Sequence, residues 1–180
     1  MSARHPTISN AYLAQQQKLH EDPNYGVASR LLAPVVKEVI RMFPVKSISD
    51  YGAGKKNLLN ALNELGVTDL AYFPYDPAFP EYGAPVPADM VCCIDVLEHI
   101  EPDYLNVVLA ELSSLVEKFG FFSIHTIQAM KTLPDGRNAH LIQNPSSWWL
   151  PRLCEYFEIL HLARLPDGFW VIVEPKTAST

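Results

Sequence analysis

The sequence predicts an α/β protein with a doubly wound, mostly parallel sheet that ends in an antiparallel hairpin. Short apolar runs alternate along the chain with segments of helical periodicity, an order typical of parallel strands joined by helical crossovers. Near the C-terminus, two extended runs at 156–165 and 169–174 flank Pro166-Asp167-Gly168. That turn signal predicts that the two runs pair antiparallel.

The N-terminal part of the chain predicts two helices. Ser9 can cap a helix that runs to about residue 21, and the Asp-Pro-Asn-Tyr-Gly segment at 22–26 then breaks it. A second helix is expected over 29–42, where apolar residues recur at helical spacing. Pro34 falls in its first turns, where proline is tolerated if the helix begins late.

Strands and helices then alternate to the end of the chain. Strands are expected at 45–51, 70–75, 90–95 and 119–126, with helices over 56–65, 101–118 and 146–155. The run at 90–95 is almost wholly apolar, as a strand covered on both faces requires. The helix over 101–118 carries the clearest amphipathic pattern.

Composition and charge exclude several classes of protein. The chain has 180 residues, of which 48% are hydrophobic and 19% charged, so we expect one domain over 1–180. A net charge of −6 argues against binding of long nucleic acid by bulk electrostatics. The sequence shows neither the apolar core of a signal peptide nor a membrane-spanning run, so we expect a cytoplasmic protein that does not bind membranes. Three cysteines form no disulfide framework and no metal-ligand spacing, and we predict no metal site.

The loop after the first strand is the candidate ligand site, because ligands of open parallel sheets bind beyond the carboxyl ends of the strands. Two nucleotide-binding patterns do not match it. A phosphate-binding P-loop lacks its first glycine and its hydroxyl residue here, and a dinucleotide fingerprint lacks its third glycine, since that position is Asn57. An acidic residue followed by Gly-x-Gly does match, with Asp50, Gly52 and Gly54.

This loop resembles the first motif of class I S-adenosylmethionine-dependent methyltransferases. Two later segments are similar to the same family. Asp76 ends the second strand, where it would accept hydrogen bonds from ribose hydroxyls, and Asp-Val-Leu-Glu-His at 95–99 follows the family's fourth strand. The resemblance covers about residues 25–174 and implies S-adenosylmethionine as the cofactor. The residues it implies for the cofactor are Asp50, Tyr51, Gly52, Ala53, Gly54, Asp76, Pro77, Asp95 and Val96.

Two features depart from the family's pattern. Lys56 stands where many members have a third glycine, so its side chain must point away from the ligand or the pocket must be wider. The interval 77–89 is short and rich in proline, so the second crossover is expected to lose its helix and to have one edge strand reduced or absent. The residue that would contact adenine is left unassigned.

Methyl transfer from a sulfonium needs the acceptor held in line, and a hydroxyl or amine acceptor needs a base. His125 and His99 at strand ends, with His140 in the loop 128–144, are the candidate bases; a packing role for His99 is equally compatible. His5, His20 and His161 are interpreted as surface or strand-face residues. By analogy with related folds, residues 1–28 form a helical lid. The candidate substrate-binding residues are Tyr25, Arg137, Asn138 and Trp148.

The predicted function is therefore methyl transfer from S-adenosylmethionine to a small-molecule acceptor, by O- or N-methylation. A non-catalytic binding or scaffolding subunit with the same fold is the alternative, motivated by Lys56 and the shortened crossover. A nicotinamide-dependent dehydrogenase is disfavoured by Asn57 and by the terminal hairpin. A homo-oligomer is compatible with the sequence.

Overall fold

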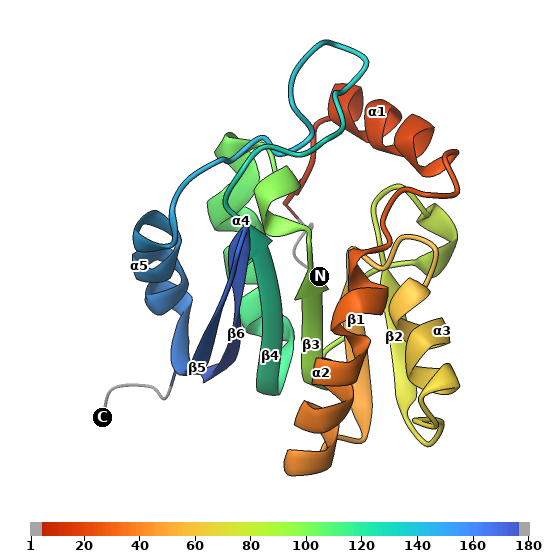
Figure 1. Ribbon diagram of the computed structural model, residues 1–180, viewed down its shortest axis with the longest axis vertical. Coiled ribbons are helices and arrows are strands. Elements are labelled where there is room, and N and C mark those ends of the chain that lie inside the picture. Colours follow the sequence, from red (N-terminus) through yellow and green to blue (C-terminus); the bar gives the residue numbers. More distant parts are fainter. Residues whose placement is uncertain (1–4, 177–180) are drawn as a thin grey trace.

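A six-stranded sheet in the order β2-β1-β3-β4-β6-β5 is the centre of the computed structural model, which describes residues 5–176 (Figure 1). The first four strands are parallel, and β6 pairs antiparallel with both β4 and β5. The mostly parallel sheet with a terminal hairpin is confirmed. The strands are β1 (Ser47–Tyr51), β2 (Ala71–Tyr75), β3 (Ala88–Ile94), β4 (Val116–His125), β5 (Phe157–Leu165) and β6 (Gly168–Pro175).

Helices cover both faces of this sheet, which makes the fold doubly wound. The helices are α1 (Asn10–His20), α2 (Ala28–Met42), α3 (Asn57–Glu64), α4 (Leu105–Leu115) and α5 (Ser146–Tyr156). Buried residues of α2 and α3 share one apolar cluster with β1, β3 and β4, whereas α4 and α5 belong to a second cluster on the other face. In Figure 1, α2 and α3 lie in front of the sheet and α4 lies behind it.

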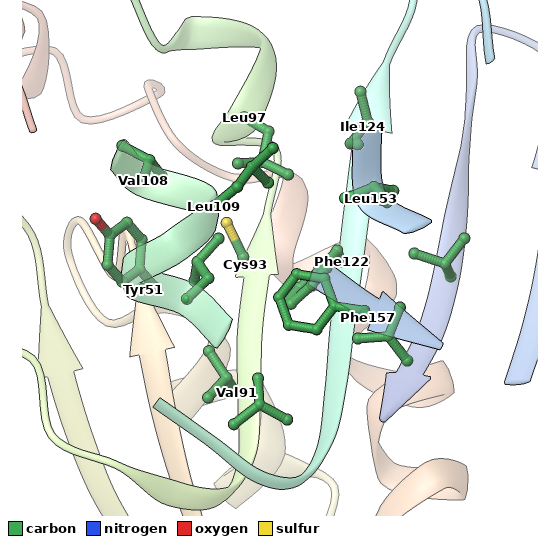
Figure 2. Close-up of a cluster of buried hydrophobic side chains, with 14 of the residues drawn as sticks. Tyr51, Val91, Cys93, Leu97, Val108, Leu109, Phe122, Ile124, Leu153 and Phe157 are labelled. Carbon is green, nitrogen blue, oxygen red and sulfur yellow. The ribbon is translucent and has the colours of Figure 1, made fainter. Parts of the chain in front are cut away.

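The second cluster shows how β3 and β4 hold the site end of the sheet rigid. Figure 2 shows Cys93 of β3 beside Leu109 of α4 and Val91 farther along the same strand, with Phe122 of β4 beside Phe157 at the start of β5. All five side chains are fully buried. Close packing of this kind fixes the strand ends that carry the candidate site.

Two helices differ from the sequence-based expectation. The helix expected over 101–118 is limited to Leu105–Leu115, because Pro102 opens a 3₁₀ turn and Val116 already pairs with Ala88 in the sheet. The helix carrying Pro34 does not begin late; it starts at Ala28, and Pro34 lies inside it. The shortened second crossover is confirmed, since only a 3₁₀ turn, Pro80–Tyr82, separates β2 from β3 and β2 is an edge strand.

The carboxyl ends of β1 to β4 meet at one edge of the sheet, and α1 lies beyond that edge (Figure 1). Ser9 caps α1 by accepting a hydrogen bond from Tyr12 N–H, as expected. Ser9 is also held by Glu101, whose carboxylate accepts from its backbone N–H at 2.8 Å and its hydroxyl at 2.7 Å. The first helix is thereby fixed over the strand ends. Within residues 5–176, no helix has the length and apolar character that crossing a membrane requires.

Candidate functional site

A cavity of about 600 Å³ lies between the carboxyl ends of β1 to β4 and the inner side of α1. One side of the cavity is formed by the loop at 50–54, called the glycine loop below. The other side is formed by three histidines, His99, His125 and His140. Tyr12, Gln16 and His20 of α1 line it from above. Every residue that the sequence assigned to a cofactor lies in its wall, namely Asp50, Tyr51, Gly52, Ala53, Gly54, Asp76, Pro77, Asp95 and Val96.

The glycine loop is pinned to the ends of the neighbouring strands. The N–H groups of Gly52 and Ala53 donate to the Tyr75 carbonyl at 2.8 and 2.9 Å. Gly52 has φ +82°, and a Cβ there would lie 2.3 Å from Cγ2 of Val96, the second residue after β3. Only glycine fits this close approach and this backbone conformation. The loop therefore presents bare backbone to the cavity.

Lys56 does not obstruct the cavity. Its backbone is left-handed, with φ +59°, and its Nζ lies 4.6 Å from the ring centroid of Tyr82, outside the cavity wall. The preceding Lys55 donates from its Nζ to the carbonyls of Asp22 and Tyr25, which ties the segment after α1 to the glycine loop. Of the two expected ways to accommodate Lys56, the structure shows the one in which the side chain points away.

Two buried carboxyls stand beneath the glycine loop. Asp50 is 3% exposed and accepts a hydrogen bond from the Tyr72 hydroxyl; burial raises its pKa to about 7. Asp76 accepts from Gly54 N–H at 3.0 Å and from Ala78 N–H at 2.8 Å, and burial raises its pKa as well. The Asp76 side chain is therefore fixed at the end of β2, facing the cavity.

His20 lies in the wall of the cavity, which the sequence did not predict. It is neither a surface nor a strand-face residue, because α1 folds over the cavity and carries it inward. Its Nε2 lies 3.9 Å from Asp76 Oδ2, and its ring packs edge-on against Tyr25 and Phe79. A Cβ on Gly54 would lie 3.0 Å from its Cε1. Burial lowers the pKa of His20, which favours the neutral imidazole.

The three candidate bases lie together at the opposite side of the cavity. His125 Nδ1 is 3.1 Å from Asp95 Oδ1, and the His140 and His99 rings meet edge-on with centroids 4.8 Å apart. Burial lowers the pKa of His99 to about 4, so this ring is neutral at physiological pH. His99 therefore packs against His140 as well as lining the cavity.

Glu98 was not singled out from the sequence. It is fully buried, and its Oε1 accepts a hydrogen bond from His125 N–H at 2.6 Å. Burial, and then the charge of Asp95, raises its pKa well above the usual range. One ligand atom from each of Asp95, Glu98, His125 and His140 lies within 4.8 Å of the others. Asp95 and Glu98 are far in the sequence from His125 and His140, and the four side chains converge only in the fold, whereas the prediction of no metal site considered cysteine spacing alone.

Of the predicted substrate-binding residues, Tyr25 lines the cavity and the other three lie outside it. Arg137 is held by Asp135, with Nη2 2.7 Å from Oδ2. Asn138 is turned inward to its own loop, where its Oδ1 accepts from the backbone of Ala129 and His140. Trp148 projects from α5 toward Arg152, whose guanidinium carbon is 3.5 Å from its ring centroid. Arg137, Asn138 and Trp148 therefore do not line this cavity, and their role in substrate binding stays a prediction.

Neither a family model nor a curated protein sequence matches the chain. Solved structures do match it. The chain is similar to 1,6-didemethyltoxoflavin-N1-methyltransferase of Burkholderia thailandensis, solved with its substrate and S-adenosylhomocysteine, with a TM-score of 0.63 and 16% identity over 98% of this chain and 92% of that one. A complex of DhpI with S-adenosylhomocysteine matches with a TM-score of 0.60 and 13% identity over 93% and 98%.

The PH0226 protein of Pyrococcus horikoshii OT3 matches with a TM-score of 0.60 and 12% identity, over 93% of this chain and all of that one. These matches cover nearly the whole of both chains, so the shortened second crossover leaves the overall topology unchanged. The chain has the class I methyltransferase fold.

Proposed function

We propose that this protein is an S-adenosylmethionine-dependent methyltransferase that acts on an oxygen or a nitrogen of a small-molecule acceptor. One observation supports the proposal most strongly. The glycine loop and the Asp76 carboxylate line the same cavity, at the carboxyl ends of β1 and β2. Two structural neighbours with the same fold, 1,6-didemethyltoxoflavin-N1-methyltransferase and DhpI, were solved with S-adenosylhomocysteine bound.

The residues present fit such a cofactor. Gly52 and Gly54 leave bare backbone where a nucleoside must approach closely, and a Cβ at either position would meet a neighbouring side chain at 3.0 Å or less. The fixed carboxylate of Asp76 is an acceptor suited to ribose hydroxyls. A volume of about 600 Å³ lies within the usual range for small-molecule and cofactor sites.

When bound, the cofactor supplies a methyl group already activated on a sulfonium. The protein then has to orient the two reactants and exclude water. Tyr12 and Tyr25 close the cavity from the side of α1, and Tyr12 is fixed there because its hydroxyl donates to the His99 carbonyl at 2.8 Å. On the far side, the histidines and Asp95 stand where the proton of a hydroxyl or amine acceptor can be taken.

The non-catalytic alternative loses one of its two motivations. Lys56 interacts with Tyr82 and lies outside the cavity wall, so it does not block a nucleoside. The shortened crossover remains, but it removes residues at the edge beyond β2 and leaves the cavity between β1 and β4 intact. The geometry therefore favours an enzyme over a scaffolding subunit.

Isothermal titration with S-adenosylmethionine and with S-adenosylhomocysteine, in the presence of a chelator, tests the proposal. We expect saturable binding of both by the native chain and at least tenfold weaker binding by Asp76→Ala, a loss of about 1.4 kcal/mol or more. Asp69→Ala, at the opposite end of the sheet and exposed, is the matched control and should bind normally.

Folding of each variant is checked by circular dichroism, and Asp76→Asn, which keeps an acceptor oxygen for Gly54 N–H, serves as a second variant. Absence of heat with both nucleosides at about 1 mM, a concentration at which even weak specific complexes form, would refute cofactor binding. Equal affinity of the Asp76 and Asp69 variants would refute the assigned role of Asp76.

A further inference from the structure

The side of the cavity opposite the glycine loop gathers two carboxylates and two imidazoles from separate elements. Asp95 directly follows β3, Glu98 lies in the next turn, His125 ends β4, and His140 belongs to the long loop after it. Their ligand atoms, one from each side chain, lie within 4.8 Å of one another. Because β3 and β4 are adjacent and parallel, their carboxyl ends bring these groups together.

The spacing of these atoms is close to that of a metal coordination shell. An ion about 2.1 Å from each ligand holds neighbouring octahedral ligands about 3.0 Å apart and opposite ligands about 4.2 Å apart. His125 Nδ1 and Asp95 Oδ1 are 3.1 Å apart, which matches neighbouring ligands. No two of the four ligand atoms are more than 4.8 Å apart, which exceeds the spacing of opposite ligands by at most about 0.6 Å, so a small contraction around an ion is enough.

Glu98 supplies an independent sign that the cluster is built for a cation. Its side chain is 0% exposed, and its Oε1 is already engaged by His125 N–H. Within the described part of the chain, no N–H or O–H group donates to its Oε2. A buried carboxylate oxygen without a donor is costly, and a neighbouring carboxylate, Asp95, increases that cost. A divalent cation between the two carboxylates removes both penalties.

His140 is oriented as metal-binding histidines are. Its Nδ1 lies 2.6 Å from the carbonyl oxygen of Ile127. Since a carbonyl only accepts hydrogen bonds, Nδ1 carries the hydrogen, and the lone pair of the neutral ring is on Nε2. Asn138 fixes the same residue from the other side, because its Oδ1 accepts from His140 N–H at 3.0 Å. A second ring nitrogen bonded to a backbone carbonyl is the usual support of a metal-ligating imidazole.

The backbone of Asp95 is in a strained, left-handed conformation. Asp95 is one of two non-glycine residues with positive φ in the described chain, at +59°. Such strain persists where the surrounding structure over-determines it, and it concentrates at functional sites. Ser123 holds the strained position through its hydroxyl, which accepts from Asp95 N–H at 3.0 Å.

We infer that Asp95, Glu98, His125 and His140 form a binding site for one divalent first-row transition cation. Two carboxylates and two neutral imidazoles are a mixed oxygen and nitrogen set, which suits manganese, iron, cobalt or zinc better than calcium. Four protein ligands leave open positions on an ion of higher coordination number, and three of the four, Asp95, His125 and His140, line the cavity from which an acceptor would approach.

The role of the cation rests on the proposed methyltransferase function, and it narrows the acceptor to a compound that presents a hydroxyl oxygen to the ion. A cation lowers the pKa of a hydroxyl that it binds. The acceptor O–H bond then breaks and its proton leaves to water. The oxygen forms a bond to the methyl carbon while the carbon–sulfur bond breaks, and the electron pair of that bond stays on sulfur. His125 and His140 thereby act as ligands and not as bases.

The test uses the full chain, stripped with a chelator and titrated with MnCl₂ in the absence of any nucleoside. Electron paramagnetic resonance of free Mn²⁺ reports binding without reference to activity. We expect one ion per chain, and at least tenfold weaker binding by Glu98→Gln and by His140→Gln. Glu98→Gln keeps the oxygen that accepts from His125 N–H, which preserves that contact. His161→Gln, on the exposed face of β5, is the control and should bind as the native chain does.

Asp95→Asn is the second carboxylate variant, because its side chain is 22% exposed and its substitution disturbs the core less. No Mn²⁺ binding by the native chain up to about 1 mM would overturn the inference, and would indicate that Glu98 holds a proton instead. Equal binding by the native chain, the three ligand variants and the control would also overturn it. If the chain binds the nucleosides but not Mn²⁺, only the cation site is rejected. If it binds Mn²⁺ but neither nucleoside, only the proposed cofactor binding is rejected.

Discussion

The buried carboxyl of Asp50 gives the fold a dependence on pH that Asp50→Asn removes. Its pKa is about 7 in the folded protein and about 3.9 in an unfolded chain. The folded state therefore keeps a proton that the unfolded state releases, and the stabilisation this provides is complete below pH 4 and lost as the pH rises through 7. The three-unit difference corresponds to about 4 kcal/mol above pH 7.

Asparagine is neutral at every pH and still offers an oxygen to the Tyr72 hydroxyl. The titration of Asp50 destabilises the native chain by about 1.5 kcal/mol at pH 5 and by about 4 kcal/mol at pH 8, relative to low pH. The stability of Asp50→Asn relative to the native chain should therefore increase by about 2.5 kcal/mol between these two pH values.

Urea unfolding of both proteins at pH 5 and pH 8 measures this change, and every other titrating group is common to the two. Tyr72→Phe removes a hydrogen bond that lowers the Asp50 pKa, so this variant should lose stability over the same interval more steeply than the native chain. A stability difference between Asp50→Asn and the native chain that is the same at pH 5 and pH 8 would refute the assigned pKa.

Three further predictions concern the loops around the cavity. Gly52→Ala should cost about 2–4 kcal/mol of unfolding free energy, from left-handed strain and the clash with Val96, and Val96→Ala should recover part of it; purely additive effects of the two would contradict the contact. Lys56→Gly should raise the free energy of unfolding in urea by about 1 kcal/mol by relieving φ +59°, whereas a loss would show that the contact with Tyr82 outweighs the strain. Asn138→Ala should weaken Mn²⁺ binding at least threefold in the resonance titration and leave nucleoside binding unchanged, since it releases the loop of His140 on the side of the cavity opposite the glycine loop and Asn138 does not itself line the cavity.

Much of the fold follows from local sequence. The apolar run in β3 and the Pro-Asp-Gly turn before β6 have strong local signals, and both elements form where expected. The glycine loop was also located from sequence, because Gly52 and Gly54 are required by the local backbone path. The end of α4 was not found, since Val116 is drawn into the sheet by pairing with Ala88, which no local pattern records.

The features of the site that sequence reasoning missed depend on contacts between distant segments. His20 reaches the cavity only because α1 is held across the strand ends by Glu101, which is far along the chain. Glu98 joins His125 and His140 only because two parallel strands end side by side. Arg137 was expected in a pocket from its loop position, but Asp135, two residues away, engages its guanidinium. The charge of a side chain and its position in the sequence were not enough to predict whether it lines the cavity.

Whether one cavity holds both a nucleoside beside Asp76 and a cation beside Asp95 is measured most directly by nuclear relaxation. The protons of S-adenosylhomocysteine are observed in the presence of the protein, first with Mg²⁺ and then with paramagnetic Mn²⁺. We expect Mn²⁺ to broaden these signals with the native chain, most strongly at the sulfur end of the ligand, and much less with Glu98→Gln. Signals that are equally sharp with both ions, while the nucleoside is bound, would contradict a shared cavity.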